Sequence, residues 1–141
     1  MSTLLELVQD ELLRSLALLD AQVASYSFAR PDGPIDVKTR AFVVRLDHDA
    51  WRPEVLVGAT HDAEWFSLNE VLWCLAIDLR VPRKAWTEIL RWLRPVLANN
   101  AGLLTELFAQ GEWRLNKQRL FAARRTYNAQ PISRRLPNEE L

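Results

Sequence analysis

The chain has 141 residues with 18 Lys and Arg against 18 Asp and Glu, so its formal net charge is zero. This length predicts one domain, and an apolar content of 49% with only four glycines excludes a disordered or collagen-like chain. The single cysteine, Cys74, excludes an internal disulfide. The zero net charge hides a polarised chain, because residues 1–79 hold 6 basic against 13 acidic side chains and residues 80–141 hold 12 against 5.

A long amphipathic helix is predicted over residues 3–28. Thr3 and Glu6 form a capping box, and apolar residues then recur at spacings of three and four. Alternating apolar residues at 42–46 and 55–57 predict two strands of a β-hairpin, whose loop is longer than the tightest type. The first half of the chain is therefore expected to hold one helix and one hairpin.

The second half is predicted to be helical. Ser67 and Glu70 form another capping box, and Pro82 suits the first turn of a new helix. Pro95 is expected to kink or end that helix early, and Gly111 to interrupt the next one. The predicted helices are 68–79, 82–97 and a third beginning at 103, followed by a basic segment reaching Tyr127. In the first of these helices Leu79 belongs to the apolar stripe, and Trp73 lies off it.

These elements predict an α+β fold that is mainly α, with a long N-terminal helix, a small β-hairpin, and then a bundle of three to four helices. Residues 1–130 are expected to form a single compact domain, and residues 131–141 a mobile C-terminal tail, because the tail has two prolines and mixed charge. The N-terminus lacks a signal-peptide pattern, and no apolar run approaches the ~20 residues of a membrane span. A cytoplasmic protein without membrane contact is therefore expected.

Candidate catalytic residues are few. The two histidines, His48 and His61, each have acidic neighbours, which raises the alternatives of a metal site or an acid–base pair. On the hairpin they would stand at opposite ends, on the order of 20 Å apart, so they could not share one metal. Cys74 stands among apolar residues, as a core thiol does. No nucleotide-binding or hydrolase motif occurs, so no catalytic residue, metal or other cofactor is predicted.

The segment 75–91 resembles a helix-turn-helix of the repressor type. A small residue at Ala76 and apolar residues around it match the pattern that lets two short helices cross closely. Arg80 stands where the turn usually has glycine, and so would require a left-handed or altered backbone. The resemblance implies DNA-contacting side chains on the outer face of the second helix, namely Arg83, Lys84, Thr87 and Arg91.

Tryptophan and arginine in the second half also fit a protein-binding surface, since both types are enriched at binding hot spots. Trp92 falls to the side of the inward stripe of its helix and is expected to be an exposed hot spot of this surface. The leading interpretation is a non-enzymatic regulatory or inhibitory protein, of the kind that phages or mobile elements encode, which occupies a protein or nucleoprotein partner. The alternatives are a helix-turn-helix DNA-binding regulator and an enzyme using His48 or His61, and a homodimer stays open. The further residues expected at the partner surface are Arg94, Arg114, Lys117, Arg124 and Arg125.

Overall fold

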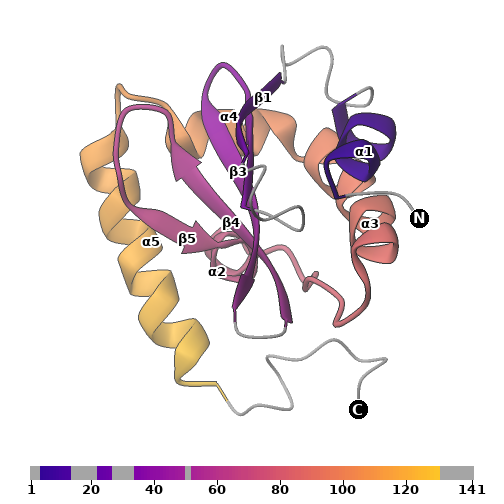
Figure 1. Cartoon of the computed structure of the whole chain (residues 1–141). Helices are drawn as coiled ribbons and strands as arrows, with labels where there is room; N and C mark the ends of the chain where they lie inside the picture. The colour runs from indigo at the N-terminus through magenta and orange to yellow at the C-terminus, as the bar shows by residue number, and fades with distance from the viewer. Residues whose placement is uncertain (1–3, 14–21, 27–33, 50–51, 131–141) are drawn as a thin grey trace.

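The computed structural model describes residues 4–13, 22–26, 34–49 and 52–130 (Figure 1). Its centre is an antiparallel sheet of five strands, ordered β1-β2-β3-β4-β5, so each strand pairs with its neighbours in the sequence. The strands are β1 (Gln22–Tyr26), β2 (Ile35–Lys38), β3 (Phe42–Asp49), β4 (Arg52–Ala59) and β5 (Trp65–Ser67). The helical segments are α1 (Leu4–Val8), the π-helical η1 (Gln9–Leu13), α2 (Leu68–Cys74), α3 (Trp86–Asn99), α4 (Ala101–Phe108) and α5 (Trp113–Asn128).

One face of the sheet forms the core. Val37, Val44, Val57 and Phe66 lie side by side across β2 to β5 and are completely buried. Helix α4 lies behind this face in Figure 1. The ring of its Phe108 packs against the ring of Phe42 in β3, with 6.5 Å between the ring centroids. The residues between them in each strand point to the other face, because successive side chains of a strand alternate.

Helices flank the sheet on two sides. In Figure 1, α1 and α3 stand together on one side and α5 runs along the other. Val8 and Leu12, of α1 and η1, are buried in the same core as the inner residues of α3. Helix α5 packs chiefly against α2, so the second half of the chain does not form one continuous helical bundle.

The predicted fold class was wrong in two respects. Among the described residues of the expected helix over 3–28, only residues 4–13 are helical, and residues 22–26 form a strand. The expected hairpin is the middle of a five-stranded sheet. Both errors arise because β1 and β2 are short segments whose strand structure depends on pairing with the neighbouring strand, which the spacing of apolar residues within each segment does not reveal.

The helix boundaries of the second half also differ from the prediction. The capping box at Ser67 and Glu70 is confirmed, with both of its hydrogen bonds formed, but α2 ends at Cys74 and not at Leu79. Helix α3 begins at Trp86, after an extended approach, and continues past Pro95. Pro95 is exposed on the outer side of the helix, where α3 tolerates it.

The β3–β4 hairpin is tighter than predicted, because β3 extends to Asp49 and β4 begins at Arg52. His48 therefore belongs to a strand and pairs with Pro53, while His61 follows the opposite end of β4. Among the described residues, no helix is both long and apolar enough to cross a membrane. The predicted tail, 131–141, lies outside the described residues.

Candidate functional site

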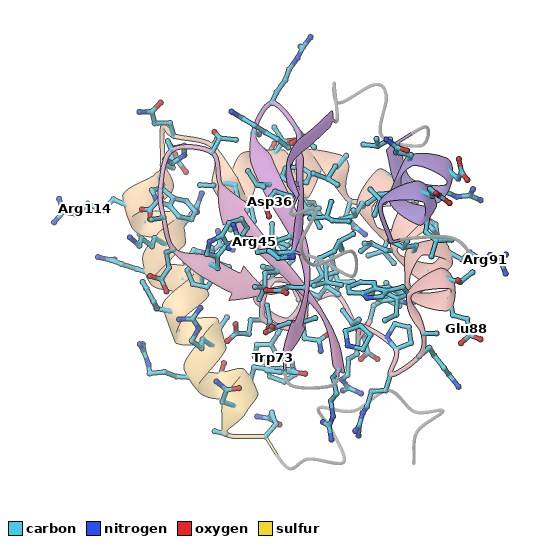
Figure 2. All side chains as sticks on the ribbon, in the orientation of Figure 1. Asp36, Arg45, Trp73, Glu88, Arg91 and Arg114 are labelled. Carbon is cyan, nitrogen blue, oxygen red and sulfur yellow. The ribbon has the colours of Figure 1, made fainter. Side chains whose placement is uncertain are left out.

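The residues predicted to bind a partner do not form one surface. Those on or before α3 lie on one side of the sheet, and those on α5 lie on the other (Figure 1). Figure 2 shows Arg91 and Arg114 pointing away from the molecule in opposite directions. The polarised second half of the chain therefore presents two separate candidate surfaces.

The α3 side presents exposed cations. Arg83, Lys84, Arg91 and Arg94 are exposed, and Thr87 is half-buried. Lys84, Arg91 and Arg94 already have interaction partners. Trp92, expected to be an exposed hot spot, is half-buried and packs against the core.

The helix-turn-helix segment has an unusual connection. Eleven residues, 75–85, separate α2 from α3, whereas the motif has a turn of three or four. Among the described residues other than glycine, only Ala76 has a positive φ, 57°, so the left-handed residue is not Arg80. DNA binding through this segment stays a prediction.

The loop that follows α2 is held in place by backbone hydrogen bonds. The N–H of Ala76 donates to the Trp73 carbonyl, and the N–H of Ile77 donates to the Leu72 carbonyl at 2.9 Å. This pair of bonds is a Schellman motif, which normally has glycine at its left-handed position. Asn69, near the start of α2, accepts a hydrogen bond from the Val81 N–H at its Oδ1, at 2.7 Å, and so holds the middle of the loop against α2.

This loop and the last turns of α5 enclose a groove of about 290 Å³. Its apolar lining includes Trp73 and Leu79, which remain 37% and 42% exposed. The Trp73 indole N–H donates to Thr126 Oγ1 at 3.0 Å, and its ring meets Tyr127 edge-on. The groove is lined by Asn69, Trp73, Ala76, Ile77, Asp78, Leu79, Arg80 and Tyr127.

Helix α5 carries five cations and no carboxylate. Its inner side buries residues at alternating spacings of three and four, from Trp113 to Tyr127. Its exposed side is here called the α5 surface. The α5 surface consists of Arg114, Leu115, Gln118, Arg119, Arg125 and Thr126.

Two of the five cations pair within the molecule. Lys117 Nζ lies 2.9 Å from Asp62 Oδ2. Arg124 pairs with the nearly buried Glu70 at 3.0 Å and with Glu64 at 3.3 Å. Lys117 and Arg124 were predicted to meet a partner, but their charges are already neutralised by the acidic half of the same chain.

The other three cations belong to the α5 surface. Arg119 donates to the neutral side chain of Asn116 at 3.1 Å. Neither it nor Arg114 or Arg125 forms an ion pair with a carboxylate in the part of the chain that the structure describes. Unpaired positive charge is thus concentrated on the exposed side of one helix.

Asp62 anchors the β4–β5 turn to α5. Trp113 Nε1 donates to it at 2.8 Å, and the Glu64 N–H at 2.9 Å. The Trp113 N–H, with Lys117 and the Glu64 backbone, holds the pKa of Asp62 well below its usual value, because these donors stabilise the carboxylate. Next to it, His61 Nε2 lies 3.0 Å from the Phe108 carbonyl, so this histidine also joins the turn to the helices.

The far face of the sheet carries a fixed ion pair. Asp36 accepts two hydrogen bonds from Arg45, at 2.7 and 2.9 Å, and these bonds raise the pKa of Arg45. Arg45 in turn stacks 4.3 Å from the centre of the Trp65 ring, which lies close over Gly58. Figure 2 shows Asp36 and Arg45 together in the middle of the sheet. This arrangement links four strands and leaves the cation already paired.

The structure does not assemble the predicted catalytic alternatives. His48 and His61 belong to opposite ends of the hairpin. Burial raises the pKa of the Cys74 thiol, which disfavours the thiolate that a nucleophile requires. Within the described ranges, no three His, Cys, Asp or Glu residues are placed to hold a metal ion.

A comparison of the chain with protein-family models, curated proteins and solved structures found no match. The site therefore has to be interpreted from its own geometry. The predicted site residues did not include Trp73 and Leu79, the two large apolar residues of the groove that are exposed. A signal existed for Trp73, which lies off the apolar stripe of its helix, whereas Leu79 was assigned to that stripe because the end of α2 was misplaced.

Proposed function

We propose that the protein is a non-enzymatic binding protein that occupies a protein partner and holds an acidic segment of it against the α5 surface. The observation that carries the proposal is the charge of Arg114, Arg119 and Arg125, which form no ion pair among the described residues and share the exposed side of α5 with the 59% exposed Leu115. Exposed arginine next to exposed apolar and aromatic side chains is the composition of binding hot spots.

A protein partner accounts for more of this surface than a nucleic acid does. Phosphates would pair with the arginines but would leave Leu115 and the groove residues Trp73 and Leu79 in water. A protein segment with both carboxylates and apolar side chains covers all of them, which removes apolar area from water.

A small protein that only occupies its partner acts as a regulator or an inhibitor of that partner. A reducing compartment such as the cytoplasm fits the single, half-buried Cys74. Trp73 takes the place of Trp92 as the tryptophan expected to contact the partner, because the Trp73 ring is more exposed and borders the groove.

The experiment is affinity purification from the native cell, with and without nuclease, of the wild type and of two charge-reversal variants. One variant changes the α5 surface (Arg114→Glu, Arg119→Glu and Arg125→Glu), and the matched control changes the α3 side (Arg83→Glu and Arg91→Glu). A protein partner should be retained after nuclease, lost by the α5 variant, and retained by the α3 variant.

Other outcomes would overturn the proposal. Capture that nuclease abolishes, together with loss in the α3 variant alone, would favour the helix-turn-helix alternative; its DNA binding should also weaken steeply with added salt. Capture of only a second copy of the chain would show that the α5 surface is a dimer interface. Retention of the partner by the α5 variant would exclude this surface.

A further inference from the structure

One flank of α5 lines up apolar and cationic side chains with the groove. Leu115, Arg119, Ala122 and Thr126 follow spacings of four, three and four, so they form a single stripe along the helix. The stripe is roughly 16 Å long at 1.5 Å per residue. At its C-terminal end Thr126 holds the indole of Trp73, and Figure 2 shows Trp73 beside these last turns of α5.

The two ends of the stripe are concave. The groove of about 290 Å³ lies at the Thr126 end. Two of its lining residues already use their polar groups, since Asn69 accepts the Val81 N–H and the Trp73 N–H donates to Thr126. The charged side chains of Asp78 and Arg80 belong to the same lining, beside the apolar Trp73, Ile77 and Leu79. A second and more open hollow, of about 510 Å³, lies at the other end and is lined by Gly111, Glu112, Arg114, Leu115 and Gln118, so Leu115 is its one large apolar residue. The groove can therefore receive an apolar side chain, and the exposed Leu115 offers an apolar contact at the other end, with the cation Arg119 between them.

We infer that the partner segment is an acidic amphipathic α-helix that lies along α5. It places one large apolar side chain in the groove, a carboxylate about seven residues away opposite Arg119, and a second apolar side chain about eleven residues away over Leu115. A helical partner segment has a stripe of side chains at the same three- and four-residue spacings as the stripe of α5, so the two stripes can stay in contact along their whole length. An extended segment would match the ends but would turn alternate residues away from the surface. This inference rests on the proposed function.

The test uses two synthetic helical peptides of identical composition. The first has apolar residues about eleven positions apart with a glutamate about seven positions from the groove end, and the second has the same residues in scrambled order. Fluorescence anisotropy of the labelled peptide measures binding to the full chain. The indole N–H resonance of Trp73, assigned with Trp73→Phe, reports whether the groove is occupied.

The structure provides a matched control. Leu115 and Leu103 are both exposed leucines, at 59% and 47%, but only Leu115 lies on the stripe. Leu115→Ala should weaken binding of the first peptide roughly tenfold, whereas Leu103→Ala should leave it unchanged. Arg119→Glu should weaken binding by at least as much and reduce its dependence on salt.

Equal binding of the two peptides, equal effects of Leu115→Ala and Leu103→Ala, or an unmoved Trp73 resonance would each overturn the helical occupant. Absence of peptide binding at millimolar concentration would do the same. If the peptide test fails but the α5 charge-reversal variant still loses a protein partner in the purification, the proposed function stands and only the helical conformation of the partner segment is wrong. If that loss is also absent, the proposed function fails as well.

Discussion

Replacing Arg124 by methionine should destabilise the fold strongly, whereas the same replacement at the adjacent Arg125 should not. Arg124 Nε donates to Glu70 Oε2 at 3.0 Å, and Nη2 donates to the Trp65 carbonyl at 2.6 Å. A third bond reaches Glu64 at 3.3 Å. Arg125 is exposed and forms no ion pair within the described residues.

The magnitude follows from the environment of each partner. The Glu70 side chain is only 9% exposed, so loss of its cation should cost about 1.5 to 3 kcal/mol. The more exposed pair with Glu64 contributes at most about 1 kcal/mol. Methionine keeps part of the apolar contact with Phe66 and Phe121, over which the guanidinium lies. The total expected for Arg124→Met is therefore about 3 kcal/mol.

The assay is urea unfolding followed by circular dichroism for the wild type, Arg124→Met and Arg125→Met. The free energy of unfolding should fall by about 3 kcal/mol in the first variant and by less than about 0.5 kcal/mol in the second. In a Glu70→Gln background, Arg124→Met should cost less, because a neutral amide does not need a cation. A loss below about 1 kcal/mol, or equal losses at the two arginines, would refute this reasoning.

Three further predictions concern the loops that hold the site. Asp62→Asn should lower the free energy of unfolding at pH 7, because the fold stabilises the ionised Asp62 carboxylate and so depresses its pKa. The difference from the wild type should shrink as the pH falls below about 4, where the unfolded chain takes up the proton first. Urea unfolding at pH 7 and pH 3 measures this difference, and a difference that does not change with pH would contradict the prediction. Ala76→Gly should raise the free energy of unfolding by about 0.5 kcal/mol by relieving the left-handed backbone, and no gain in a thermal melt would count against it. Gly58→Ala should cost about 1 to 3 kcal/mol in urea unfolding, because its Cβ would meet the Trp65 ring at 3.0 Å, and a neutral effect would show that the ring moves freely.

Local signals in the sequence predicted the structure well where the structure depends on local contacts. The capping box of Ser67 and Glu70 forms because its partners are three residues apart. The strands β3 and β4 were recognised from their alternation, and Gly111 separates α4 from α5 as expected. The N-terminal strand β1 was missed because its spacing also fits a helix, and only pairing with β2 decides between them.

The groove could not be predicted because it depends on where α2 ends. No glycine marks that end, and Ala76 adopts the left-handed conformation through two backbone hydrogen bonds that the sequence does not reveal. Once the helix ends at Cys74, Leu79 moves from an expected inward stripe to the exposed rim of the groove. A shift of a few residues in one boundary thus changes a core residue into a candidate contact residue.

The polarity of the chain now has a structural account. The pairs Asp62–Lys117 and Glu70–Arg124 join the acidic first half to the basic second half across more than fifty positions, so part of the opposite charge is used to attach α5 to the sheet and α2. The charge that remains on α5 is on its exposed side. One flank of α5 therefore pairs with the rest of the fold through Lys117 and Arg124, and the exposed side is left for a partner. Charge reversal at Arg114, Arg119 and Arg125 should impair binding while the fold is retained, and loss of Arg124 should impair the fold first.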